Sequence, residues 1–313
     1  MKFDIDFIGR TKIWFAISAT VILIGLVGLG AKGLNFGIDF KGGTSFEVKM
    51  SKPIGVLDAR HELKKLGLEN AIVQPVGKNQ MLIRTQAIGA DEQAKVKRDI
   101  SDRFGVKPGE INVQSVGPGW GQEITNAALR ALAVAIGGLL VYISLRFEFK
   151  MAVAAIVALV HDILITIGIY ALVGREVNPN TIAALLTILG YSLYDTIVVF
   201  HRIKENSAKM AKETYSSMAN RSINQVLIRS INTTMTTILP VTAILFLGGE
   251  TLKDFAFALF IGIASGAYSS IFVATPLLAL WKEREPQYQV LRRKYGAKKR
   301  SGADDALAAA VNK

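Results

Sequence analysis

Six long apolar runs, separated by polar segments, dominate the pattern along this chain of 313 residues. The runs cover residues 13–30, 127–145, 151–173, 181–200, 233–247 and 255–281. A transmembrane helix needs about 20 mainly apolar residues to cross a hydrocarbon core about 30 Å thick. The pattern therefore predicts an α-helical polytopic membrane protein with six transmembrane helices. The first run is long and no clean cleavage site follows it, so we expect an uncleaved anchor.

The polar segment between the first and second runs predicts a small soluble domain at residues 31–124. Strands are predicted at 44–50, 71–76, 80–85 and 111–116, and amphipathic helices at 56–66 and 91–104. The order β-α-β-β-α-β is typical of an α+β, ferredoxin-like domain. Gly77-Lys78-Asn79 predicts a hairpin turn, and Gly117-Pro118-Gly119 predicts a hinge before the second helix. The domain has no evident catalytic constellation, so we interpret it as a binding or moving part.

The distribution of basic residues predicts the orientation of the chain. These residues precede the first run, separate the second from the third, and recur in residues 202–229 and in the tail. They fall on one side of the membrane only if both termini are cytoplasmic. The predicted parts are the N-terminus with the first helix (1–30), an extracytoplasmic domain (31–124), a five-helix bundle (125–281) and a basic cytoplasmic tail (282–313).

Composition and motifs narrow the classes of function. Apolar residues make up 50% of the chain and charged residues 20%, with a net charge of +12. In a membrane protein, cytoplasmic basic residues that face anionic lipid explain such an excess without nucleic acid. The chain has no cysteine, no HExxH metal motif and no P-loop. We therefore expect no metal, no cofactor, no nucleotide site and no enzymatic activity.

One aspartate lies inside the fourth apolar run. Asp195 is roughly 8 Å from the cytoplasmic end of that run at 1.5 Å per residue. Together with Thr187, Tyr191 and Arg202 it forms a polar stripe at helical spacing. Two interpretations remain open, a structural residue that holds one helix to another and a protonatable group on an ion path. The second is favoured, because ionisable residues within transmembrane helices are usually functional.

A second polar stripe begins with Arg229 at the start of the fifth run. Its other members are Asn232, Thr233, Thr236 and Thr237, and it ends near Pro240, where we expect the helix to bend. Taken alone, Arg229 is equally well explained as an anchor at the cytoplasmic end. Because adjacent spans are antiparallel, both charges lie toward the same end. We therefore predict a proton relay in which the Arg229 guanidinium reaches the Asp195 carboxylate.

Two further features concern the third and sixth runs. Asp162 is interpreted as a local hydrogen-bonding group between helices in preference to a second relay group. Gly262 and Gly266, with Ala258 and Ser270, place small residues at every fourth position. This spacing predicts close packing against another helix.

Several motifs together indicate a known family. They are residues 36–44 (FGIDFKGGT), 189–200 (LGYSLYDTIVVF), 202–206 (RIKEN), 229–237, 248–249 and 268–274. With them, nearly the whole chain resembles the SecF family, the smaller membrane subunit of the bacterial SecDF protein-export complex, in the RND superfamily. In that family an aspartate of the fourth span and an arginine of the fifth are implicated in proton transport. They correspond to Asp195 and Arg229, although Tyr194 and His201 depart from the family's usual asparagine and acidic residue.

The resemblance implies an RND half-unit that pairs with SecD beside the SecYEG channel, in the bacterial cytoplasmic (inner) membrane. The complex would use the proton motive force to assist late-stage export of an emerging unfolded polypeptide. One alternative is half of an RND-type small-molecule exporter, which predicts a drug-sized pocket. Another is a non-transporting structural subunit of the translocon, which predicts normal activity after Asp195→Asn or Arg229→Ala. An intramembrane protease is the weakest alternative, because no paired aspartates occur in facing runs.

Overall fold

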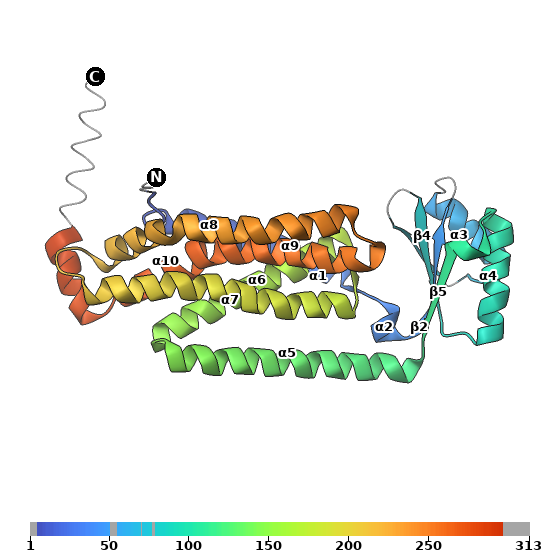
Figure 1. Ribbon diagram of the computed structural model, residues 1–313, viewed down its shortest axis with the longest axis horizontal. Coiled ribbons are helices and arrows are strands. Elements are labelled where there is room, and N and C mark those ends of the chain that lie inside the picture. The colour runs from blue at the N-terminus through green and yellow to red at the C-terminus, as the bar shows by residue number, and fades with distance from the viewer. Residues whose placement is uncertain (1–4, 51–54, 70, 77–78, 297–313) are drawn as a thin grey trace, which may run out of the picture. The chain divides into compact units, whose positions relative to one another are not determined.

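Six helical segments have the length and composition to cross a membrane in the part of the chain that the structure describes. The structure is a computed structural model that describes residues 5–50, 55–69, 71–76 and 79–296. The segments are α1 (Thr11–Lys32), α5 (Pro118–Arg146), α6 (Phe149–Val173), α7 (Pro179–Ala208), α8 (Tyr215–Leu247) and a sixth that joins α9 (Glu250–Ser269), a π-helical turn (Ser270–Ala274) and α10 (Thr275–Lys282) (Figure 1). The predicted set of six apolar helices is thus present.

The helices extend beyond the apolar runs from which they were predicted. Helix α5 begins at Pro118, so the predicted hinge is already part of a helix. Proline suits this place, because the first turn of a helix leaves backbone N–H groups unpaired in any case. The basic segment after the fourth run is also largely helical, since α7 ends at Ala208 and α8 begins at Tyr215. Helix α8 continues through Pro240 without interruption.

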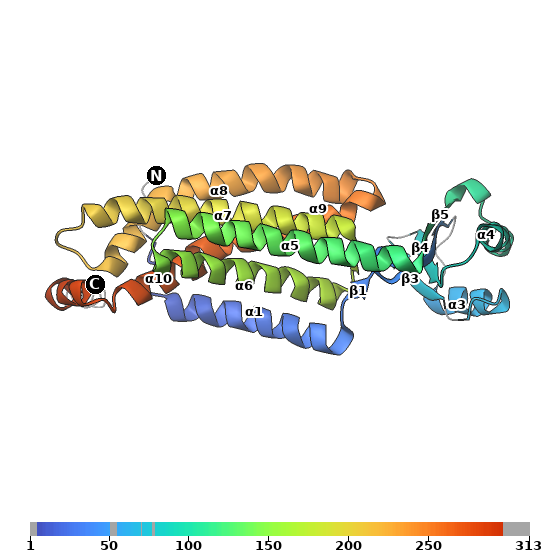
Figure 2. The same cartoon turned by 90° about the horizontal axis from the view of Figure 1, so that it is seen from below.

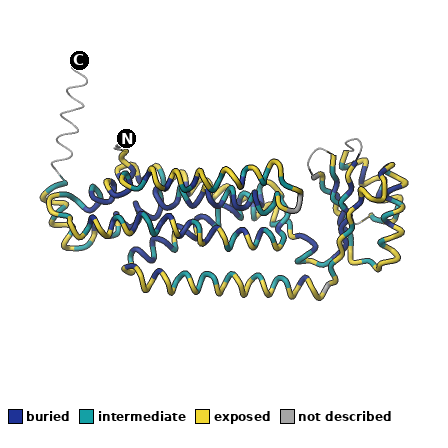
Figure 3. Tube along the Cα trace, in the orientation of Figure 1, coloured by how far each residue is buried: buried dark blue, intermediate teal, exposed yellow. Residues whose placement is uncertain are grey.

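The chain divides into two compact units, one helical and one of α+β type. The helical unit comprises Met1–Leu34, Ala133–Arg175 and Asn180–Lys313. Within it, α6, α7 and the α9–α10 segment are the most buried helices, while α1, α5 and α8 are largely exposed (Figure 3). Figure 2 shows α1 and α8 at opposite edges of this unit. Exposed apolar side chains on membrane-length helices are expected to face lipid or another subunit.

Helices α1 and α6 approach each other at a pair of glycines. A Cβ added at Gly25 would lie 2.9 Å from the Gly168 Cα atom, and a Cβ added at Gly168 would lie 2.7 Å from the Gly25 Cα atom. Real Cβ atoms essentially never come so close to backbone, so only glycine permits this contact. Small residues at such crossings allow the close backbone packing that holds helices together in lipid.

We expect Gly168→Val to lower the stability of the helical unit by about 1–3 kcal/mol, because the added side chain forces α1 away from α6. Thermal unfolding of the full chain in detergent measures the effect. Gly138→Val is the matched control, because a Cβ at Gly138 of α5 meets nothing within 4 Å. Equal stability losses in the two variants would contradict the prediction.

The α+β unit has a four-stranded antiparallel sheet. Its elements are β2 (Gly43–Lys49), α3 (Val56–Lys65), β3 (Ile72–Val76), β4 (Gln80–Thr85), α4 (Ala90–Phe104) and β5 (Ile111–Val116). The strand order is β3-β4-β2-β5. The element order β-α-β-β-α-β agrees with the sequence prediction, and the predicted boundaries of β4 and β5 match. Of the predicted hairpin turn, Gly77 and Lys78 lie outside the described residues.

The core of this unit forms between the sheet and its two longer helices. Phe46 and Ile83 of the sheet, Leu63 of α3 and Ile100 of α4 are almost fully buried. Alternate residues of β2 and β4 point to the same face, which explains why period-two patterning revealed the strands. Two short elements before the core were not predicted, β1 (Asn35–Phe36) and α2 (Ile38–Lys41).

The α+β unit also includes a short segment that follows α6 in the sequence. Strand β6 (Glu176–Val177) follows α6 and pairs in parallel with β1, so that Asn35 lies opposite Glu176. The unit therefore comprises Asn35–Leu132 together with Glu176–Pro179, in contrast to the single continuous domain at 31–124 that the sequence indicated. The boundary within α5 differs because that helix continues from one unit into the other.

Candidate functional site

Asp195 lies inside the helical unit, and one of its two carboxylate oxygens accepts a hydrogen bond. It is on α7, its residue is 6% exposed, and its Oδ1 atom accepts a hydrogen bond of 2.7 Å from the Ser230 hydroxyl of α8. Its Oδ2 atom is buried and has no hydrogen-bond partner among the described residues. A buried oxygen without a partner is unfavourable while the carboxyl is charged. A proton on Oδ2 would therefore remove the cost of burying this charge.

The sixth span changes from α-helical to π-helical geometry close to Asp195. Thr196 and Ser270 share a hydrogen bond of 2.8 Å between their hydroxyl groups, which joins α7 to the π-helical turn. The Thr275 hydroxyl donates to the Ser270 carbonyl at 2.9 Å, so a side chain supports this turn. Single π-helical turns are frequent at functional sites. The sixth span is thus irregular where it meets the helix that carries Asp195.

Arg229 does not pair with Asp195 among the described residues. Its side chain is exposed, and an Nη atom donates to the Tyr194 hydroxyl at 3.2 Å. Consecutive residues of an α-helix point about 100° apart. Ser230 therefore faces the Asp195 carboxyl, while the Arg229 guanidinium contacts the residue before Asp195 on α7. The expected ion pair between Arg229 and Asp195 is therefore not formed. Arg229 contacts the Tyr194 hydroxyl, and the next residue of α8, Ser230, contacts Asp195.

The remaining members of the two stripes do not converge on the carboxyl. The hydroxyl groups of Thr233, Thr236 and Thr237 each donate to a backbone carbonyl of their own helix, at 2.8 to 3.0 Å. Asn232 is exposed and Tyr191 is half-buried. A polar, largely exposed face therefore runs along α8 from Arg229. Polar faces of transmembrane helices usually point toward a partner or a water-filled path.

Asp162 of α6 is the centre of a second buried cluster. Only 1% of this residue is exposed, and both carboxylate oxygens are fully engaged. The Ser265 hydroxyl donates to Oδ1 at 2.7 Å, while the Ser192 and Ser269 hydroxyls donate to Oδ2 at 2.6 and 2.8 Å. His161 Nδ1 lies 3.0 Å from Oδ1. This one side chain therefore joins α6 to α7 and α9.

The cluster continues from His161 to the first helix. His161 Nε2 lies 3.1 Å from the Ser18 hydroxyl of α1, and its ring stacks on that of Tyr268 with centroids 6.0 Å apart. The Tyr268 hydroxyl in turn donates to the Trp14 carbonyl at 3.0 Å. A continuous polar network thus crosses four helices. Its members other than Asp162 were not singled out as site residues from the sequence, because isolated serines in apolar runs carry no distinctive pattern.

Helix α7 connects the surroundings of the Asp162 carboxyl with those of the Asp195 carboxyl. Ser192, a ligand of Asp162, is one turn before Asp195 on α7, and Thr196 donates to the Ser192 carbonyl at 3.2 Å. Gly262 and Gly266 lie against this helix, since a Cβ at Gly266 would lie 2.9 Å from the Ser192 Cβ atom. Helix α7 is therefore the neighbour of the small-residue face, and this close contact brings the serines of α9 within reach of Asp162.

The α+β unit has a buried ion pair beside the glycine-rich segment of residues 36–44. Arg84 of β4 donates to both the Glu176 carboxylate and the Gln74 side chain at 2.5 Å. Gly37 leaves room for this carboxylate, since a Cβ there would lie 2.3 Å from Glu176 Oε1. Burial raises the pKa of the neighbouring Asp39 carboxyl, although a backbone hydrogen bond acts in the opposite direction.

We expect Arg84→Met to loosen the pairing of β1 with β6 by about 2 kcal/mol, because it removes the guanidinium that pairs with the largely buried Glu176 carboxylate. Hydrogen exchange of residues 35–36 and 176–177 measures the opening. Arg103→Met is the matched control, because the pair between Arg103 and Glu62 is much more exposed and contributes little. Similar exchange rates in the two variants would refute the prediction.

No group of three or more His, Asp or Glu side chains that could hold a metal ion occurs within the described ranges. The buried clusters around Asp195 and Asp162 contain hydroxyl groups, carboxyl groups and one imidazole ring. Fold and site together define a multi-pass membrane protein that has ionisable side chains inside a helical unit and that also has a small α+β unit.

Comparison with known proteins identifies the family. The model of the C-terminal region of the protein export membrane proteins SecD/SecF matches residues 96–284, and the SecD/SecF GG motif matches residues 27–54. The protein translocase subunit SecF of Streptomyces coelicolor is 44% identical, with 95% of this chain and 82% of the relative covered. SecF of Magnetococcus marinus is 41% identical, with 88% and 91% covered. The chain belongs to the SecD/SecF family of protein export membrane proteins, as a SecF-type subunit.

Solved structures extend this result to the fold. A crystal structure of SecDF, a translocon-associated membrane protein from Thermus thermophilus, superposes with a TM-score of 0.84 and 36% identity. It covers 90% of this chain, which spans 39% of the solved chain. A second SecDF crystal structure, in a super-membrane-facing form, gives a TM-score of 0.68 at 35% identity over 96% of this chain and 40% of the other. This chain thus corresponds to about two fifths of the solved SecDF chains.

Proposed function

We propose that this chain uses the proton motive force to assist late-stage export of polypeptides, with Asp195 as the group that gains and loses the proton. The observation that carries the proposal is the buried Oδ2 atom of Asp195, which has no partner among the described residues. Protonation supplies a hydroxyl there and removes the cost of a buried charge. Similarity to SecF translocase subunits supports the link to protein export.

Arg229 acts in this proposal at the exposed side of the carboxyl. It is held by Tyr194 and lies next to Ser230, which donates to Asp195. A proton that enters along the polar face of α8 would pass the guanidinium before it reaches the carboxyl. Loss of the Ser230 contact, or rotation of α8 relative to α7, would change the distance between the two charges. The proton state and the helix arrangement are coupled in this way.

A partner subunit is proposed to cover the polar face of α8. This face carries Arg229 together with the threonines whose hydroxyls, among the described residues, bond only to their own helix. Charged groups on transmembrane helices rarely face lipid directly. The solved SecDF chains, which are longer than this one, support SecD as that partner. The SecYEG channel, the emerging polypeptide and the surrounding lipid bilayer complete the proposed set of contacts.

The proposed setting follows the distribution of basic residues. Both termini lie in the cytoplasm, the chain crosses the bacterial inner membrane six times, and the α+β unit lies outside. The strand order of that unit supports the ferredoxin-like type. Proton movement would drive a rearrangement of this unit, which would pull or hold the emerging chain. No enzymatic step is part of the proposal.

Proton flux tests the proposal directly. The chain is reconstituted with SecD in vesicles that enclose a pH-sensitive dye, and a proton gradient is imposed. Wild-type complexes should conduct protons in a manner that depends on export, whereas Asp195→Asn complexes should not. Unchanged flux in an assembled Asp195→Asn complex would refute the assignment of Asp195.

A further inference from the structure

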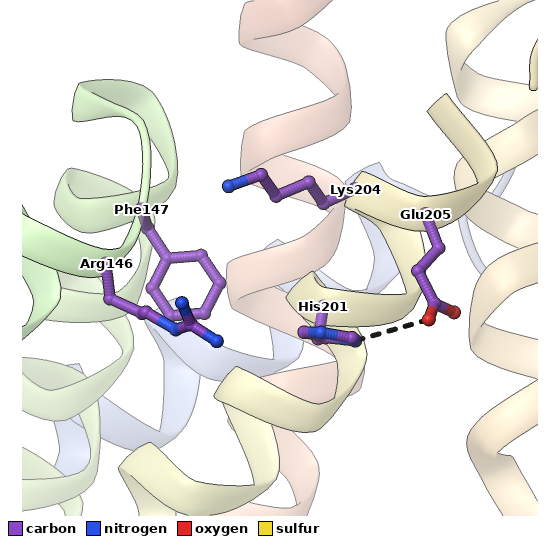
Figure 4. A pocket seen from close by; sticks show the side chains of 5 residues that line it. All are labelled: Arg146, Phe147, His201, Lys204 and Glu205. Atoms are coloured by element: carbon purple, nitrogen blue, oxygen red, sulfur yellow. Dashed lines mark ion pairs between the residues drawn. The ribbon is translucent and has the colours of Figure 1, made fainter. Parts of the chain in front are cut away.

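A hollow in the helical unit lies where α5 ends and α7 approaches its own end. Its volume is about 340 Å³, and it is lined by Arg146, Phe147, His201, Lys204 and Glu205 (Figure 4). Arg146 is the last residue of α5, and Phe147 follows in the turn to α6. The other three residues come from the polar end of α7. Neither of the buried clusters around Asp195 and Asp162 includes any of these residues.

The hollow has an excess of positive charge. Within the part of the chain that the structure describes, the side chains of Arg146 and Lys204 have no hydrogen bond or ion pair. The one carboxylate of the lining, Glu205, is already engaged, since Arg202 pairs with it at 2.8 Å and His201 lies 3.7 Å away. Two cations are therefore left without a counterion inside one concave surface. Such an arrangement favours an anion that can accept several hydrogen bonds.

Apolar surface adjoins these cations. Phe147 is buried and makes an edge-to-face contact with Phe200, with ring centroids 6.3 Å apart. Leu145 and Phe149, on either side of the turn, are 84% and 74% exposed. Both belong to helices of membrane length, at the point where one span ends and the next begins. A ligand here would meet positive charge and lipid-facing surface at the same time.

We propose that this hollow binds the phosphate-bearing headgroup of an anionic phospholipid. Arg146 offers a planar, forked set of donors to the phosphate, and Lys204 adds a compact charge. The acyl chains lie along the exposed apolar side chains at the end of α5, beside Leu145. A soluble phosphate ion would use the same two cations but would leave the apolar surface unoccupied. The apolar surroundings therefore favour a lipid as the source of the phosphate.

Native mass spectrometry of the full chain tests the proposal, with phosphatidylglycerol titrated into a neutral detergent. We expect the double variant Arg146→Gln/Lys204→Gln to bind the lipid roughly thirtyfold more weakly, because each basic group near anionic lipid contributes about fivefold. The matched control is Lys209→Gln/Lys212→Gln, which removes the same charge near the same end of α7 but outside the hollow. This control should bind almost as the wild type does.

A third variant should act in the opposite direction. Glu205→Gln removes the only negative charge of the lining and releases His201 and Arg202, so lipid binding should become several times tighter. Equal losses in both double variants would overturn the proposal, because they would indicate general attraction to the basic surface. Unchanged binding in Arg146→Gln/Lys204→Gln would overturn it as well. So would displacement of the lipid by inorganic phosphate at similar concentration, which would identify a site for soluble anions.

Discussion

Asp195→Asn is expected to abolish the part of polypeptide export that depends on the proton gradient, while export without a gradient continues. Asparagine keeps the size of the side chain and can still accept from Ser230, but it cannot take up a proton. One charge that falls through 100 mV releases about 2.3 kcal/mol, which corresponds to roughly a fiftyfold bias. The measurement is the rate of precursor translocation into membrane vesicles, with the gradient imposed or collapsed.

Thr187→Val is a suitable control for this experiment. Thr187 lies two turns before Asp195 on α7, and its hydroxyl donates only to the Ala183 carbonyl of its own helix, at 2.9 Å. The control should retain the full stimulation by the gradient. Assembly with SecD is checked for both variants by co-purification. Stimulation that persists in an assembled Asp195→Asn complex would instead favour a structural subunit.

Asp162→Ala is expected to destabilise the helical unit by about 2–5 kcal/mol. The substitution leaves the hydroxyls of Ser192, Ser265 and Ser269 without their acceptor and opens a cavity among three helices. The lower value assumes about 0.6 kcal/mol for each hydrogen bond, as found between helices in lipid. The upper value applies when a buried partner is removed outright. Thermal unfolding of the full chain in detergent measures the loss.

Two further variants sharpen this prediction. Asp162→Asn keeps an acceptor oxygen and the volume of the side chain, so its loss should be clearly smaller than that of alanine. Thr236→Ala removes a hydroxyl that donates only within α8, and its effect should stay within about 0.5 kcal/mol. If Asp162→Ala unfolded at the temperature of this control, the cluster around Asp162 could not be what holds the helices together.

The contrast between the two carboxyls follows from their hydrogen bonds. Both are buried aspartates on neighbouring helices, which corrects the expectation that no paired aspartates occur in facing runs. Every oxygen of the Asp162 carboxyl has at least one donor, so the group is a fixed joint between helices. Asp195 has one donor and, among the described residues, one unpaired oxygen, which is why we propose it as the group that exchanges a proton. The first prediction therefore concerns transport and the second concerns stability.

Much of the fold was predictable because the relevant signals are local. Long apolar runs indicated every span, although the run at 233–247 is shorter than a full span, and alternation with period two located the strands β4 and β5. The lengths of the apolar runs did not predict where the helices begin and end. Helix α5 begins at Pro118, well before its apolar run, because backbone hydrogen bonding continues through polar residues outside the hydrocarbon. The pairing of β1 with β6 gave no local signal, since the two strands come from distant parts of the chain.

Spans, strands and the buried position of Asp195 follow from the order of amino acids, because hydrophobic periodicity and the cost of a charge in lipid act along a single segment. The partners of each carboxyl do not follow in this way. They depend on the rotation of one helix about its axis relative to the next, and a step of one residue turns a side chain by about 100°. That rotation directs Ser230 to Asp195 and Arg229 to Tyr194, and the approach of α9 to α7 at Gly266 brings the serines to Asp162.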